Sequence, residues 1–429
     1  MKWLYAILFS FVCYLPLMAG DPVLQVFDGK DYKPFSWEEI DFITYESGAL
    51  IIHLNNGDKD KVYVSDELEI PSAPTLPLFE INTVESLTEI PNREDYKDSE
   101  FQLKGFGDYD DVTATGAIRG RGNTSWYFPK KPYRLKFDKK VSLCGLPAAK
   151  SYVLLANYND CSLIQNALAF KIGEMLKLPY TNRFVPVDVK LNGIYKGSYL
   201  LTNKPGINSG SVDIDEDNSI MWELDQAYDE EFKFRSPLLD LPVMVADPDL
   251  IEKKFEEWKA DFIAMERAAV QYKASSLVDM DILARYVLVY EILKNDEIGW
   301  PKSVKLFKTK GGKYIFGPIW DFDTAMGKVW GEDSYTTGAI TQPVWKNKLL
   351  RYLENDPQYK ESIKNAWKEI RETLPEILDF IDLYSEEIYS SANRNQIIWT
   401  DLEDYELSVK KLKQWLRMRF IALEMIIEN

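Results

Sequence analysis

Two aspartates, Asp321 and Asp323, stand one residue apart in the segment GPIWDFDTAMG at 317–327. In an extended chain, alternate side chains point the same way, so both carboxylates would face one region. The flanking Trp320 and Phe322 indicate partial burial, where two ionised carboxylates so close together need a cation or protons. The pattern is consistent with a metal site, an acid/base pair or an ordinary turn, since aspartate is common in turns.

Histidine usage restricts the chemistry further. His53 is the only histidine in the chain, and it lies in ALIIHLNNGD, whose alternation predicts a strand running into a turn. Ser-His-Asp sites, Cys-His sites and H-E-x-x-H zinc sites all need histidine near the reaction. Catalysis would therefore rely on carboxylates, amides, lysine and arginine. An all-oxygen site for Mg²⁺ is then the natural candidate for the aspartate pair.

A basic cluster occupies residues 118–137, IRGRGNTSWYFPKKPYRLKF. Backbone N–H groups beside glycine, together with arginine and lysine, bind phosphoryl oxygens well, although a solvated basic face is the alternative. If a strand runs through 131–137, Lys131 shares a face with apolar side chains and is the basic residue expected to project inward. The basic residues of the cluster are Arg119, Arg121, Lys130, Lys131, Arg134 and Lys136.

A third polar group, Asn295 and Asp296, follows a strongly apolar helical segment. Asparagine is common where a helix ends, so Asn295 has a structural explanation. A carboxylate at that end faces the unfavourable pole of the helix dipole. We therefore expect a compensating contact between Asp296 and a metal ion or a substrate.

The elements that would position these groups follow from periodicity. Residues 21–77 are predicted to form a small β-rich module that ends in the proline-rich linker PSAPTLP at 71–77. Residues 78–202 are predicted to be β-rich with one helix, whose start Asp160 would cap. Asn192-Gly193, between two alternating runs, predicts a β-hairpin.

The second half of the chain, about 203–429, is predicted to be mostly helical, chiefly after residue 250. A hairpin at 304–323, with Gly311-Gly312 at its turn, interrupts the helices and carries the aspartate pair. Residues 357–428 predict two or three amphipathic helices. The fold class expected from the sequence is therefore α+β.

Composition and the N-terminus indicate the class of protein. Residues 1–20, MKWLYAILFSFVCYLPLMAG, have the pattern of a secretory signal peptide, and no later segment is apolar enough to span a membrane, so we expect export to the periplasm, the cell surface or the medium. A net charge of -17 argues against nucleic-acid binding. Beyond the leader, Cys144 and Cys161 are expected to be two thiols, with a disulfide between them as the alternative.

Several of these segments occur together in one known family. The chain from about 78 to 327 resembles the CotH kinase family of exported bacterial proteins, of which this would be a Bacteroides-type member. The resemblance implies an atypical protein-kinase-like, two-lobed fold that binds ATP and Mg²⁺ and phosphorylates serine or threonine of a protein acceptor. The matching segments, in the family's order, are IRGRGNTSW, KKPYRLKF, LLANYNDCSLIQNALAF, VDVKLNGIYKGSYLLT, NDEIGWPKS and GPIWDFDTAMG.

The resemblance also implies roles around the metal and the reacting hydroxyl. Asp296 would be the catalytic aspartate. Asp321 would hold Mg²⁺, with Asp323 or Asn295 assisting.

For the nucleotide, the resemblance implies that Lys131 and Arg134 contact the phosphates, with Arg121 near them. Trp320 is assigned to the nucleotide site as well. Phosphoryl transfer asks mainly for positioning and charge neutralisation, which these residue types supply without histidine.

Two positions depart from the family pattern: Gln165 stands where arginine is usual, and Asn203 stands where an acidic residue is usual. A catalytically silent binding or adhesion protein of the cell envelope on the same fold is therefore an alternative. A secreted glycan-active enzyme that uses paired carboxylates is a second alternative.

Overall fold

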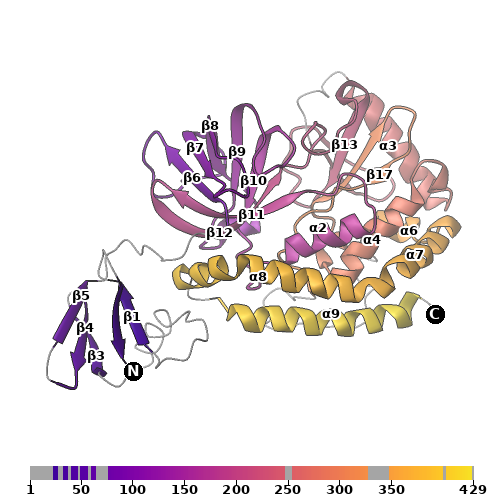
Figure 1. Cartoon of the computed structure of the whole chain (residues 1–429). Coiled ribbons are helices and arrows are strands. Elements are labelled where there is room, and N and C mark those ends of the chain that lie inside the picture. Colours follow the sequence, from indigo (N-terminus) through magenta and orange to yellow (C-terminus); the bar gives the residue numbers. More distant parts are fainter. Residues whose placement is uncertain are drawn as a thin grey trace. The chain divides into compact units, whose positions relative to one another are not determined.

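The computed structural model describes residues 23–27, 32–36, 40–46, 49–56, 59–63, 76–246, 254–326, 347–399 and 402–427. The chain divides into two compact units, Met1–Ala73 and Pro74–Asn429 (Figure 1). The predicted leader at 1–20 and most of the predicted linker at 71–77 lie outside the described residues.

The first unit is built from short antiparallel strands. β1 (Val23–Phe27) pairs with β2 (Tyr32–Ser36), and a separate sheet contains β3 (Ile40–Glu46), β4 (Ala49–Leu54) and β5 (Lys59–Tyr63). His53 lies in β4, paired with Phe42 of β3 and Lys59 of β5. The prediction that this histidine is a strand residue is confirmed.

The second unit begins with a closed seven-stranded barrel in the order β10-β12-β11-β6-β7-β8-β9. Within the barrel, β6 and β11 pair in parallel and the other neighbours are antiparallel. Asn192 and Gly193 turn the chain from β11 to β12 with φ of 48° and 81°, as a tight hairpin turn requires. The strands are β6 (Leu78–Thr83), β7 (Lys97–Lys104), β8 (Val112–Gly120), β9 (Tyr133–Val141), β10 (Ala149–Leu155), β11 (Phe184–Leu191) and β12 (Ile194–Asn203).

A second, five-stranded antiparallel sheet follows, which the sequence did not predict. Its order is β14 (Lys233–Arg235), β15 (Pro242–Val245), β13 (Ser219–Leu224), β16 (Val304–Thr309) and β17 (Ile315–Phe316). The predicted hairpin with Gly311-Gly312 at its turn supplies β16 and β17. β13 and β15 were missed because they are short and buried on both faces, so they lack the alternation of a half-buried strand. β14 does alternate, but its three residues are too few to form a recognisable pattern.

The remaining elements are helices, and the three at the C-terminus were expected. The N-cap of α2 is Ile164 and not the predicted Asp160, although the Asp160 carboxylate accepts a hydrogen bond from the Gln165 N–H at 2.7 Å. None of the described helices is long and apolar enough to cross a membrane. The helices are α2 (Gln165–Met175), α3 (Phe255–Val270), α4 (Met280–Leu293), α6 (Lys348–Leu353), α7 (Pro357–Ile370), α8 (Leu374–Ile398) and α9 (Tyr405–Ile427).

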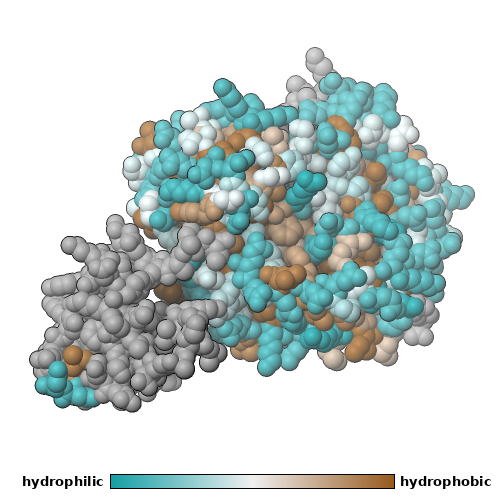
Figure 2. Space-filling model, viewed as in Figure 1, coloured by the Kyte–Doolittle hydropathy of each residue, from teal (hydrophilic) through white to brown (hydrophobic). Residues whose placement is uncertain are grey.

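Helix α8 packs against β12 of the barrel (Figure 1). Buried polar side chains join the helix to the barrel. Asp188 of β11 accepts hydrogen bonds from Ser391 and Arg394 of α8. Lys130 donates to the Ser198 carbonyl and, at 2.7 Å, to Asn395 Oδ1. The face of this unit seen in Figure 2 is largely hydrophilic with scattered apolar residues. Lys130, Asp188 and Asn395 are instead at most 2% exposed, so their contacts belong to the interior.

Candidate active site

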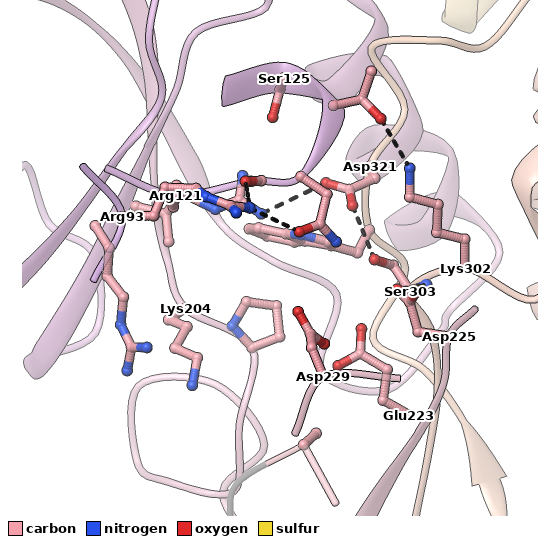
Figure 3. A pocket seen from close by; sticks show the side chains of 18 of the residues that line it. Arg93, Arg121, Ser125, Lys204, Glu223, Asp225, Asp229, Lys302, Ser303 and Asp321 are labelled. Carbon is pink, nitrogen blue, oxygen red and sulfur yellow. Dashed lines mark hydrogen bonds and ion pairs between the residues drawn. The ribbon is translucent and has the colours of Figure 1, made fainter. Parts of the chain in front are cut away.

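A pocket of about 390 Å³ opens between the end of the barrel and the second sheet (Figure 3). Its volume is in the range of small-molecule sites. Barrel strands and their loops contribute Arg93, Arg119, Arg121, Thr124, Arg134 and Lys204. The second sheet and the segments beside it contribute Glu223, Asp225, Glu297, Ser303, Asp321 and Asp323.

The two walls carry opposite charge. Arginine and lysine predominate on the barrel wall, and carboxylates predominate on the wall that faces it. Figure 3 shows Arg93 and Lys204 on one side, with Asp321 and Ser303 on the other. On the acidic wall, Lys305 forms an ion pair with Glu223 at 2.5 Å. An anionic ligand that also carries a cation would match both walls.

Asp321 is held by contacts from separate segments of the chain. Its backbone has a φ of 59°, a left-handed conformation that is uncommon for a residue other than glycine and clusters at functional sites. Ser303 donates a hydrogen bond to its Oδ2 at 2.9 Å, and Asn295 donates to its carbonyl at 2.8 Å. Arg121 lies 3.9 Å from its Oδ1 and 5.4 Å above the ring of Trp320.

Asp323 and Glu297 complete an acidic group around Asp321. Asp321 is left-handed, so the segment is not the extended D-x-D that would point both carboxylates the same way, yet Asp321 and Asp323 both line the pocket. Burial, followed by the nearby Asp321 charge, raises the pKa of Asp323 to about 6 and that of Glu297 to about 8. Lys302 lies 3.6 Å from Glu297. Burial, reinforced by repulsion from Asp321, therefore disfavours the charged forms of Asp323 and Glu297.

The residues present fit a hard divalent cation. Carboxylate oxygens are the preferred ligands of Mg²⁺, which is usually bound by one or two carboxylates together with the phosphates of a substrate. Asp321 and Asp323 would supply such a pair, and a cation bound there would reduce the repulsion that adds to burial in raising the pKa of Asp323. In the part of the chain that the structure describes, no group of three or more histidine, cysteine or carboxylate side chains is arranged to hold a metal ion.

Asp296, assigned to catalysis from the sequence, is exposed and does not line the pocket. Asn295 accepts a hydrogen bond from the Glu297 N–H at 3.0 Å and starts a short 3₁₀ turn, Asp296–Ile298. Successive side chains in such a turn point about 120° apart, so Asp296 and Glu297 face different ways. Glu297 faces the pocket instead. Asn295 is fully buried and does not line the pocket. Its side-chain amide forms hydrogen bonds with the backbone of Asp321 and Glu297.

Lys130, and not Lys131, is the lysine that projects inward. Strand β9 begins at Tyr133, so the strand register from which an inward Lys131 was predicted does not extend to that residue. The Lys131 ammonium donates to the Trp126 carbonyl at 2.7 Å and lies outside the pocket lining. Lys130 is fully buried, with its ammonium 4.5 Å from the centre of the Tyr199 ring. The other three residues expected at the nucleotide site, Arg121, Arg134 and Trp320, all line the pocket.

The two departures from the family pattern lie outside the pocket lining. Gln165 begins α2 and is buried, and its Oε1 has no hydrogen-bond partner. Asn203 is buried in the barrel, where it donates to the Pro147 carbonyl at 3.2 Å. No disulfide joins Cys144 and Cys161, and Cys144 is buried whereas Cys161 is partly exposed.

Sequence reasoning missed the acidic residues of the second sheet and the residues that follow the 3₁₀ turn. Glu223 and Asp225 lie at the end of β13, and Lys302 and Ser303 precede β16. They lie in the segments WELDQ and PKSVK. The polar residues at these strand ends have no distinctive spacing. Only the pairing of β13 with β16 brings them together.

Comparison with known proteins gives one family. The model of the family described as CotH kinase protein matches residues 118–422, which include the whole acidic group and most of the basic wall. No curated protein matches the chain.

Proposed function

The chain belongs to the CotH kinase family, and on that premise we propose that it transfers the terminal phosphoryl group of Mg²⁺-bound ATP to serine or threonine of a protein acceptor. The barrel would act as one lobe of an atypical protein-kinase-like fold, and the second sheet with its helices as the other. The pocket between them would be the active site. We further propose that residues 1–20 export the chain, so that the reaction takes place outside the cytoplasm.

The observation that supports this function best is the opposition of an arginine-rich wall and a carboxylate wall across one pocket. Phosphate oxygens suit the first wall and a divalent cation suits the second. Phosphoryl transfer depends mainly on such positioning and charge neutralisation. An acid/base reaction on a neutral sugar would not need the arginine wall, so the pocket favours phosphoryl transfer over a glycan-active enzyme.

We assign roles by position in the pocket. Arg121 and Arg134 would bind phosphate oxygens, and Asp321 with Asp323 would hold Mg²⁺. The cation, when bound, would supply charge neutralisation at the transferring phosphate. Glu297 would take the proton of the acceptor hydroxyl, the role that the sequence assigned to Asp296. Burial and the nearby Asp321 charge raise the pKa of this carboxyl to about 8, and a cation held by the aspartates would lower it toward neutrality, where a general base is most effective.

An apolar patch in the same pocket would accept the adenine base. Val153 of β10, Pro205 after β12, and Met244 and Ala246 at β15 all line this part of the pocket. Trp320 has Arg121 above its ring. We therefore propose that Trp320 supports the phosphate-binding arginine and does not stack on the base.

The test is a melting experiment with and without Mg²⁺ and ATP at millimolar concentrations. A ligand that binds only the native state must raise the Tm. The Asp321→Asn variant should lose most of this shift, because it removes a carboxylate charge from the proposed metal site. ATP with excess EDTA is the control for metal dependence. A wild-type protein that shows no Mg²⁺-dependent shift would favour the catalytically silent binding protein.

A further inference from the structure

We infer that Asp225 and Ser303 are positioning residues, which aim the Asp321 carboxylate into the pocket without reacting themselves. The inference rests on the proposed function, since it concerns the same pocket. It adds two residues to which neither the sequence motifs nor the family match assigns a role.

The first step is the end of the β13–β16 ladder. These strands pair up to Leu224 and Val304, so Asp225 and Ser303 are the first residues beyond the ladder. The Asp225 carboxylate accepts hydrogen bonds from the N–H groups of Ser303 at 3.0 Å and Ala227 at 2.7 Å. Asp225 is 5% exposed. Its carboxylate therefore joins the turn that leaves β13 to the residue that enters β16.

The second step is the conformation of Ser303. Its φ is 53°, in the left-handed region, which residues other than glycine rarely adopt. Such a conformation persists only where surrounding contacts determine it, and the Asp225 hydrogen bond is such a contact. Asp225 thus holds Ser303 in a conformation that serine rarely adopts.

The third step is the orientation of the proposed metal ligand. In this conformation the Ser303 hydroxyl donates to Asp321 Oδ2 at 2.9 Å. The other oxygen, Oδ1, is the one nearer Arg121, at 3.9 Å. The hydroxyl occupies one carboxylate oxygen and leaves the second directed toward the basic wall. Residues that orient a metal ligand in this way commonly change metal affinity by about 10- to 100-fold when they are removed.

The experiment measures the concentration of Mg²⁺, at fixed ATP, that gives half of the maximal Tm shift. Ser303→Ala and Ser303→Gly both remove the hydroxyl, but glycine tolerates the left-handed φ without cost. We expect both variants to raise the half-saturating concentration about 10-fold, although Ser303→Gly should be the more stable protein. Equal effects on binding, with unequal stabilities, would separate the hydroxyl's role from any effect on the fold.

Asp225→Asn tests whether Asp225 acts through Ser303. It should raise the half-saturating Mg²⁺ concentration, and the Asp225→Asn/Ser303→Ala double variant should resemble Ser303→Ala within about two-fold, because residues that act through one another are not additive. Ser219→Ala is the matched control. Ser219 is as buried as Ser303, at 8% exposure, and contacts Thr309 at the opposite end of the same ladder. It should respond to Mg²⁺ as the wild type does.

Three results would overturn the inference. In the first, the wild type responds to Mg²⁺ and ATP, and both Ser303 variants respond equally well. That result would reject the positioning role and leave the proposed function standing. In the second, Ser303→Gly matches the wild type while Ser303→Ala does not, which would assign the effect to the backbone. In the third, the wild type does not respond at all, which would overturn the proposed function together with this inference.

Discussion

Asp296 and Glu297 are adjacent acidic residues with different surroundings, and they provide the most direct test of the proposed base. We expect Glu297→Gln to lower kcat at least about 100-fold, the contribution typical of a positioned base. Asp296→Asn is the matched control and should stay near wild-type activity, because Asp296 is exposed outside the pocket. Phosphate incorporation into a generic Ser/Thr substrate or ATP hydrolysis measures both variants. The reverse order of effects would restore Asp296 to the catalytic role.

Lys130 should make stability depend on pH, because burial lowers its pKa from 10.5 to about 7. Above about pH 7 the native state releases this proton and the unfolded chain keeps it up to about 10.5. The unfolded state then binds more protons, so the free energy of unfolding should rise with pH in this window. Lys130→Met should remove that rise, and Lys131→Met should retain it, since it leaves Lys130 in place. Urea unfolding at several pH values between 7 and 9 measures the free energy of unfolding. If that free energy rises with pH as steeply in Lys130→Met as in the wild type, Lys130 is not the group responsible.

At the scale of elements, the docking of α8 on the barrel depends on the buried pair Asp188 and Arg394, whose side chains are 3% and 8% exposed. Asp188→Ala leaves the Arg394 charge buried and uncompensated, so the free energy of unfolding should fall by about 3 to 5 kcal/mol. On the same helix, Asp382 pairs with Lys413 at a more exposed position. Asp382→Ala should therefore cost less than about 1 kcal/mol. Chemical denaturation of both variants gives the comparison, and equal losses would show that burial of the pair is unimportant.

At the scale of the molecule, the pocket belongs entirely to the unit Pro74–Asn429, since its lining residues lie between Arg93 and Thr324. We expect a fragment of residues 74–429 to unfold cooperatively and to keep the Tm shift with Mg²⁺ and ATP. The reason is that the barrel, the second sheet and the described helices all lie within this unit. Loss of the shift in a folded fragment would show that the first unit contributes to the site.

Much of the local structure was predictable because its causes are local. The Asn192-Gly193 hairpin, the strand that contains His53 and the amphipathic C-terminal helices follow from turn chemistry and periodicity. The second sheet was not predictable in this way, since β13, β14 and β15 are stabilised by pairing with each other and with β16, far along the chain.

By itself, the sequence determined the family, the α+β class, the presence of a single histidine and the aspartate pair at 321 and 323, because residue types and spacing carry that information. The tertiary structure decided which acidic and basic side chains face one another. It turned Glu297 toward the pocket, placed Lys130 inside the barrel–α8 contact, and joined Asp225 to Asp321 through Ser303. The direction of a side chain after a helix end or a strand end depends on contacts with distant segments, and only the folded chain supplies them.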